Sequence, residues 1–124
     1  MSIQLQKPDY IVVYVSNMQR STAFYRDMLG LPLRFTTPGW TEFDTGSVTL
    51  ALHTTGVEKL PPMPARPPAG QAHLGFVVDN LQSAYAELKA KDVHFSLPPQ
   101  KQPTGRTLAV LNDPDGLGIT LQQR

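Results

Sequence analysis

The fold is decided by residues 10–35, which read YIVVYVSNMQRSTAFYRDMLGLPLRF. A second version of this stretch follows at residues 73–96, HLGFVVDNLQSAYAELKAKDVHFS. Both begin with a short β-branched run, which is typical of a strand, and continue into a helical pattern of polar and apolar residues. Asn17 and Asn80 hold the same place in the two copies, 63 positions apart (80 − 17), and this offset sets Tyr10 opposite His73. The pattern indicates an internal duplication.

Each copy predicts a strand that leads into a helix. The strands are expected at Ile11–Val15 and Phe76–Val78. Helix-start signals of the capping-box type follow, at Ser16 with Gln19 and at Asp79 with Gln82. The second helix has one clean apolar stripe at helical spacing, made of Leu81, Ala84, Tyr85 and Leu88. Gly30 suits the end of the first helix because glycine adopts left-handed backbone at no steric cost.

Three further strands are expected after each helix. In the first copy these are Leu33–Thr37, Trp40–Asp44 and Val48–His53, and in the second Val93–Leu97, Thr107–Leu111 and Gly118–Gln122. The tetrapeptide DPDG at residues 113–116 predicts a tight turn, since proline presets φ and glycine supplies a positive φ. Each half therefore reads β-α-β-β-β, and two such modules predict an α+β fold.

Composition narrows the class of protein. The chain has 124 residues, 40% hydrophobic and 17% charged, with a net charge of +1 and no cysteine. These values predict one globular domain without disulfides or thiolate metal sites, and with no nucleic-acid partner, because the basic residues are scattered. No signal peptide or membrane span is recognisable, so we expect a cytoplasmic protein without a membrane partner.

Prolines gather in KLPPMPARPPAG, residues 59–70, and divide the chain. Proline lacks an N–H and fixes φ, so this stretch can be neither a helix nor a central strand. We expect module 1 at about residues 8–54, a linker at about 55–71 and module 2 at about 72–124. The linker could also serve as a lid, and its Arg66 could reach an anionic ligand; the sequence leaves both possibilities open.

The duplicated modules, the segment SNMQRSTAFYRDMLGLPL (residues 16–33) and the closing NDPDGLGITL (residues 112–121) resemble the vicinal oxygen chelate superfamily. This group includes glyoxalase I, extradiol dioxygenases, fosfomycin-resistance transferases and bleomycin-resistance proteins. The resemblance implies a half-open cup of mixed β-sheet with helices packed outside, often built in a homodimer.

The resemblance also implies where a metal would bind, namely at one position in the first strand and one in the last strand of each module. These positions correspond here to Tyr10, Leu50, His73 and Thr120. Only His73 carries a typical metal-binding side chain, whereas a catalytic zinc takes about three protein ligands. We therefore expect no metal or other cofactor, with a divalent ion as the alternative.

Strand alternation predicts what lines the cup instead. The expected ligand-binding residues are mainly apolar and aromatic: Tyr10, Tyr14, Trp40, Leu50, Leu52, His73 and Thr120. Such a lining is usual for a small-molecule pocket. Each residue also has a simpler interpretation, with Tyr10 and Tyr14 as wall residues and His73 as a hydrogen-bonded, partly buried histidine.

Three functions remain open. The first is a binding protein of the bleomycin-resistance type that sequesters an apolar or aromatic compound, such as an antibiotic, without metal and as a homodimer. The second is a metal-dependent lyase, isomerase or dioxygenase with a diverged ligand set. The third is a metal-free enzyme with His73 or Glu42 as general base. The first is preferred, because such a pocket needs shape and apolar area rather than groups that stabilise a transition state.

Overall fold

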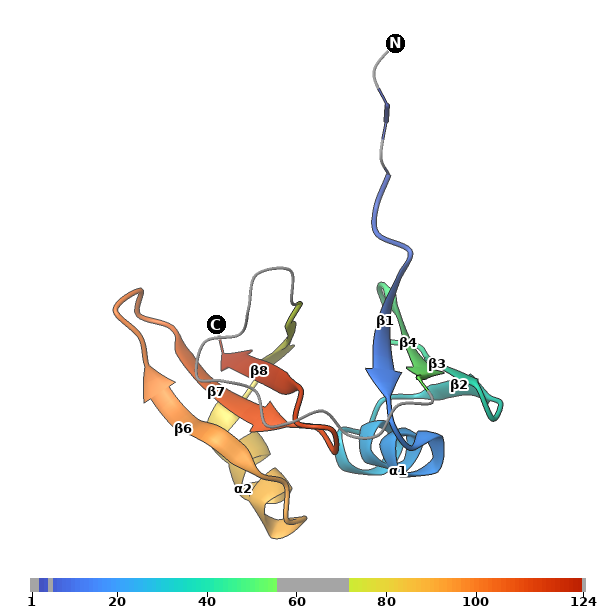
Figure 1. Cartoon of the computed structure of the whole chain (residues 1–124). Helices are drawn as coiled ribbons and strands as arrows, with labels where there is room; N and C mark the ends of the chain where they lie inside the picture. Colours follow the sequence, from blue (N-terminus) through green and yellow to red (C-terminus); the bar gives the residue numbers. More distant parts are fainter. Residues whose placement is uncertain (1–2, 5, 56–71, 124) are drawn as a thin grey trace. The chain divides into compact units, whose positions relative to one another are not determined.

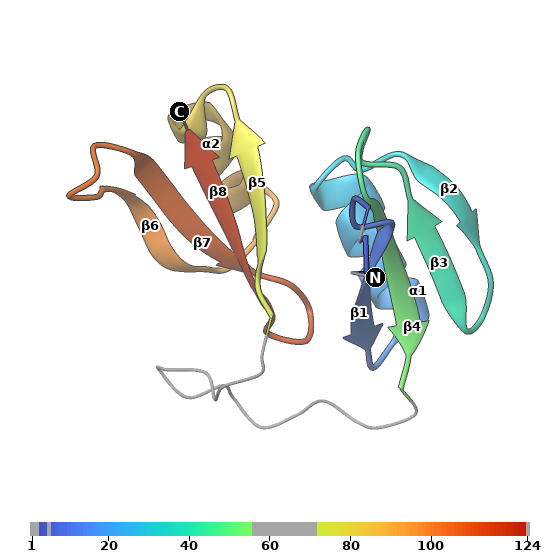
Figure 2. The same ribbon diagram turned by 90° about the horizontal axis from the view of Figure 1, so that it is seen from above.

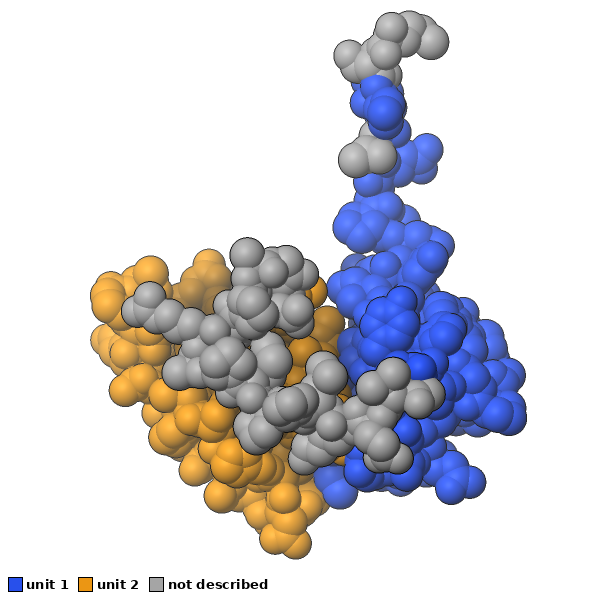
Figure 3. Space-filling view, in the orientation of Figure 1, with its two compact units in different colours: residues 1–57 blue, residues 58–124 orange. Residues whose placement is uncertain are grey.

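The computed structural model describes residues 3–4, 6–55 and 72–123. The chain forms two compact units, residues 1–57 and 58–124, which Figure 3 shows in different colours. The proposed lid and Arg66 lie outside the described residues. That both modules form one domain, with a linker at about 55–71, stays a prediction.

The first unit is a four-stranded mixed sheet with one helical segment on one of its faces (Figure 1). Strand β1 runs parallel to β4, and the other neighbours are antiparallel, in the order β1-β4-β3-β2. Its elements are β1 (Tyr10–Val15), α1 (Met18–Ala23), the π-helical turn η1 (Phe24–Met28), β2 (Leu33–Thr36), β3 (Trp40–Phe43) and β4 (Thr49–Thr54).

The second unit repeats this plan in the order β5-β8-β7-β6 (Figure 2), with β5 parallel to β8. Its elements are β5 (Leu74–Val78), α2 (Leu81–Ala90), β6 (Phe95–Lys101), β7 (Thr107–Asn112) and β8 (Gly118–Gln123). The predicted α+β fold of two βαβββ modules is confirmed. The largest difference in bounds is at β6, which was expected at Val93–Leu97 and begins and ends later.

Both helices begin one residue later than the capping-box prediction. The side chain of Asn17 accepts a hydrogen bond from the Arg20 N–H at 3.0 Å, and that of Asn80 accepts one from the Ser83 N–H at 3.0 Å. The predicted caps at Ser16 and Asp79 are therefore wrong. Asparagine caps a helix about as well as serine or aspartate, so adjacent candidates could not be separated by type alone.

The first helix ends in a wider turn. The Leu29 N–H donates to the Phe24 carbonyl at 3.1 Å, a five-residue spacing, and both Phe24 and Tyr25 are buried there, at 6% and 0% exposed. Gly30 follows with φ +74°, which confirms its predicted role at the helix end.

The core of each unit lies between its helix and one face of its sheet. In the first unit Tyr25 packs against Phe43, with ring centroids 6.1 Å apart. In the second, Leu81 and Leu88 of α2 and Leu111, Ile119 and Leu121 of the sheet are all at most 5% exposed. The opposite face of each sheet is left open by its own unit. Among the described residues, no helix is long and apolar enough to span a membrane.

The predicted turn at residues 113–116 is confirmed. The Asp113 carboxylate accepts hydrogen bonds from the N–H groups of Asp115 and Leu117, at 2.9 and 2.8 Å. Gly116 has φ +90°, the left-handed region that glycine enters freely. These bonds order the DPDG turn and fix the start of β8.

Candidate ligand-binding site

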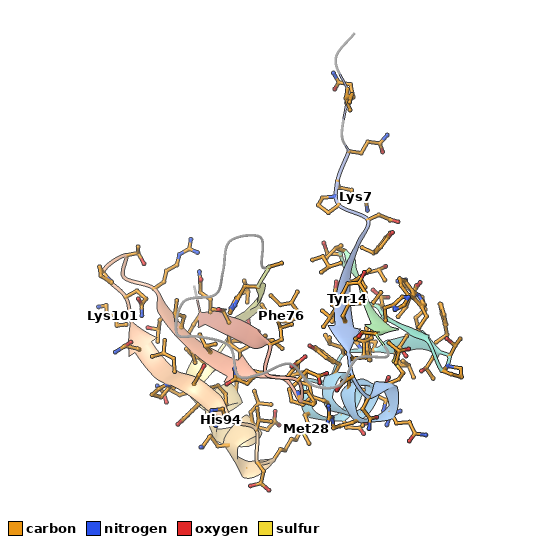
Figure 4. All side chains as sticks on the ribbon, in the orientation of Figure 1. Lys7, Tyr14, Met28, Phe76, His94 and Lys101 are labelled. Carbon is orange, nitrogen blue, oxygen red and sulfur yellow. The ribbon has the colours of Figure 1, made fainter. Side chains whose placement is uncertain are left out.

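The open face of the first sheet carries the candidate site, and strand register identifies its members. Tyr10 lies beside Thr49 and Tyr14 beside His53 on the parallel pair β1 and β4. Trp40 of β3 lies beside His53 from the other side. Neighbours in register share a face of the sheet, so these side chains meet away from α1. Tyr14 is 65% exposed there and is labelled in Figure 4.

Leu50 and Leu52 do not belong to this face, so their predicted place in the cup is wrong. They are 2% and 0% exposed. Leu52 lies beside Thr41, whose hydroxyl donates to the sulfur of Met18 in α1 at 3.2 Å. Leu50 lies beside Phe43, which contacts Tyr25. Both leucines therefore pack under the helix, as their apolar side chains require.

Four rings form a continuous aromatic surface on the open face. The centroids of Trp40 and His53 are 5.8 Å apart with nearly perpendicular planes, and those of Tyr14 and His53 are 5.6 Å apart. Tyr10 meets Trp40 edge-on at 6.3 Å. Such edge-to-face contacts are favourable between rings. We call Tyr10, Tyr14, Trp40 and His53 the ring cluster.

Glu42 holds the indole of the ring cluster in place. One carboxylate oxygen accepts a hydrogen bond from Trp40 Nε1 at 2.9 Å, and the other pairs with the Arg34 guanidinium at 3.1 Å. Arg34 also donates to the Thr49 hydroxyl at 2.9 Å. The carboxylate therefore links the indole of Trp40 to the guanidinium of Arg34.

On the open face of the second sheet, His73 is already hydrogen-bonded. Its Nε2 lies 2.6 Å from the hydroxyl of Thr120. The ring fits there because position 118 is glycine: a Cβ on Gly118 would come within 2.8 Å of the imidazole Cε1. The structure thus brings together two of the predicted residues, His73 and Thr120, and explains the glycine beside them.

The side chains at the four positions implied for a metal ion do not form a metal-binding site. In the second unit Thr120 lies beside Gly75. The counterpart of Gly75 in the first unit is Val12, and Val12 lies beside Ala51, so Ala51 rather than Leu50 holds the equivalent position. Alanine has no ligand atom. Among the described residues, no group of three or more His, Cys, Asp or Glu side chains could hold a metal ion.

His53 is the member of the site that the sequence analysis missed, because the predicted placement of Leu50 and Leu52 in the cup puts His53 on the opposite face of β4. The signal was present in TLALHT, residues 49–54. A half-buried strand alternates apolar and polar residues, and here Leu50 and Leu52 alternate with Thr49 and His53. Strict alternation predicts that the two leucines point to the core and that His53 points to the open face.

Comparison with known proteins agrees with this fold. Residues 7–121 match the family model described as Glyoxalase/Bleomycin resistance protein/Dioxygenase superfamily. The protein YaeR of Escherichia coli (strain K12) is 31% identical over 127 aligned residues, covering 97% of this chain and 98% of YaeR. The phenazine antibiotic resistance protein EhpR of Enterobacter agglomerans is 32% identical over 111 residues, covering 88% of this chain and 85% of EhpR.

A solved structure shows the same architecture. The crystal structure of lactoylglutathione lyase from Agrobacterium tumefaciens superposes with a TM-score of 0.75 at 20% identity, covering 96% of this chain and 94% of that chain. At this sequence identity the similarity shows a shared fold, but it does not show a shared reaction. With two βαβββ modules and a family match over nearly the whole sequence, the chain belongs to the Glyoxalase/Bleomycin resistance protein/Dioxygenase superfamily.

Proposed function

We propose that this chain is a small-molecule-binding protein that sequesters a planar aromatic compound, such as an antibiotic, without metal and as a cytoplasmic homodimer. The observation that carries the proposal is the ring cluster. Tyr10, beside the Trp40 indole that Glu42 holds, and Tyr14, beside His53, are 56% and 65% exposed. Rings held in this way offer stacking area at little entropic cost, because they are ordered before the ligand arrives.

The relationship to EhpR supports this class of ligand. That protein is named for resistance to phenazine, a planar tricyclic aromatic, and it aligns with 88% of this chain. Binding is preferred to a metal-dependent enzyme because Ala51 offers no ligand atom. It is preferred to catalysis by Glu42 because both carboxylate oxygens already accept hydrogen bonds.

The single tryptophan makes the proposal directly testable. Because Trp40 lies in the ring cluster, its fluorescence reports on the site without a label. Titration with phenazine is expected to quench this emission to saturation, and calorimetry should give the same dissociation constant. The proposal would be abandoned if neither method detects saturable binding of phenazine or of other planar aromatic compounds up to their solubility limits.

A matched pair of variants locates the binding. Tyr14→Ala removes one stacking partner while leaving the core intact, and should weaken phenazine binding about two- to tenfold, in line with ~0.5–1.5 kcal/mol for an aromatic contact. His94→Ala, at an exposed position before β6, is the control and should bind as tightly as the unaltered protein. Figure 4 labels both positions. Equal loss in the two variants would place the ligand elsewhere.

A further inference from the structure

The ring cluster contains one nitrogen atom, His53 Nε2, that has no hydrogen-bond partner among the described residues. His53 Nδ1 lies 2.6 Å from the carbonyl oxygen of its neighbour Thr54. A carbonyl oxygen only accepts hydrogen bonds, so Nδ1 must carry the hydrogen. In a neutral imidazole the other nitrogen, Nε2, then bears the lone pair. The backbone of β4 therefore fixes the tautomer of His53 and leaves Nε2 as an acceptor.

Nothing in the described part of the chain occupies that acceptor. The other nitrogen groups beside it are already hydrogen-bonded: Trp40 Nε1 donates to Glu42, and Arg34 donates to Glu42 and Thr49. The phenol hydroxyls of Tyr10 and Tyr14 can give or take a hydrogen bond. His53 Nε2 can only take one while the ring is neutral, so it distinguishes a ligand that donates from one that does not.

We infer that His53 is a specificity-determining residue that accepts a hydrogen bond from a hydroxyl or N–H group on the edge of the bound aromatic compound. The inference rests on the proposed function and narrows its ligand to planar aromatics that carry a donor. His53 lies between the rings of Trp40 and Tyr14. We expect a compound stacked on one of those rings to bring an edge substituent to the imidazole.

The discriminating pair of probes is 2-hydroxyphenazine and 2-methoxyphenazine. They share the same ring system, but only the first can donate a hydrogen bond. The unaltered protein should bind the hydroxy compound about tenfold more tightly, which is the usual net worth of one hydrogen bond. His53→Phe keeps a ring against Trp40 and Tyr14 but removes the acceptor. It should reduce the preference to within about twofold, mainly by weakening the hydroxy compound.

A second measurement needs no change in affinity. In protein carrying ¹⁵N-labelled histidine, the Nε2 resonance of His53 should move much further on addition of 2-hydroxyphenazine than on addition of 2-methoxyphenazine, because only the first compound donates a hydrogen bond to it. The spectrum of His53→Phe assigns the resonance, and His94→Phe is the matched control that should keep the tenfold preference. His53 is exposed, so replacement by phenylalanine should leave the fold intact.

The outcomes separate the two proposals. If both probes bind equally well and His53→Phe changes neither affinity, the role of His53 is refuted while aromatic binding stands. If phenazine binds to the unaltered protein but neither probe does, the role of His53 is refuted alone. If no planar aromatic compound binds, the proposed function fails, and the role of His53 fails with it.

Discussion

Gly118 shows how a single residue sets the position of His73. The absent side chain leaves room for the imidazole, which reaches the Thr120 hydroxyl at 2.6 Å. Gly118 is the first residue of β8, and a glycine in a strand can mark the close approach of another group, which here is the imidazole of His73.

We predict that Gly118→Ala lowers the free energy of unfolding by about 1 kcal/mol, because the new methyl group displaces the imidazole and breaks its bond to Thr120. In a His73→Ala background the same substitution should cost less than ~0.5 kcal/mol. Urea unfolding of the four proteins of this cycle measures the coupling. An equal cost in both backgrounds would mean that the clash involves another neighbour, such as Val110.

At the scale of the element, the two helices share one capping device. Asn80→Ala is expected to lower the free energy of unfolding by about 1 kcal/mol, since the Ser83 N–H loses its acceptor. Asp79→Ala, one residue earlier, is the control and should change it by less than ~0.5 kcal/mol. Thermal and urea unfolding check both values. A larger decrease in the free energy of unfolding for Asp79→Ala than for Asn80→Ala would favour the capping box predicted from the sequence.

Strand β4 has one face in the core under α1 and one face in the ring cluster. Leu52→Ala should lower the free energy of unfolding by about 2–4 kcal/mol, because it opens a cavity under α1, yet leave phenazine affinity unchanged. Tyr14→Ala should do the reverse. Urea unfolding and fluorescence titration of the same two proteins test this contrast. Weaker phenazine binding by a folded Leu52→Ala variant would indicate that Leu52 belongs to the ligand site.

The order of helices and strands could be predicted from the sequence because the same pattern occurs twice, so each copy supports the assignment of the other. Aligning the two copies did not, however, predict correctly which side chains of β4 point to the open face of the sheet. Tyr10 and His73 are 63 positions apart, but Ala51 and Thr120 are 69 apart (120 − 51), because the second module has a longer β6 and hairpin. Aligning Leu50 with Thr120 was wrong by one residue, and one residue turns a strand side chain to the other face.

Other features of the site were beyond sequence reasoning. The brace from Arg34 through Glu42 to Trp40 depends on an irregularity between β2 and β3 near Leu33 and Phe35, which shifts the pairing by one residue. The tautomer of His53 depends on a single carbonyl contact. Distances of this kind follow from packing rather than from residue type.

For the whole molecule, we predict that ligand binding is independent of metal. Protein purified without an affinity tag should show the same melting temperature, within ~1 °C, with Zn²⁺, Ni²⁺, Mn²⁺ or EDTA, because an ion that binds only the folded state would raise it. Phenazine affinity should also be unaffected by EDTA. A clear rise in melting temperature with one ion would favour the metal-dependent enzyme instead.

We also predict a homodimer in solution. The open faces of both sheets expose apolar side chains, including Phe35 and Val77 at 44% and 55%, which association of two copies would cover. Analytical ultracentrifugation should report twice the 13.7 kDa mass of the chain. A single species of 13.7 kDa at micromolar concentration would contradict the prediction.

Strand β1 has a consequence for handling the protein. Its six residues, YIVVYV, contain no charge, no proline and no glycine, and β1 is an outer strand of its four-stranded sheet. Short segments of this kind are the ones that stack into cross-β fibrils once they are uncovered. Partial unfolding during expression or heating is therefore expected to lead to inclusion bodies and aggregates through the very segment that begins the fold.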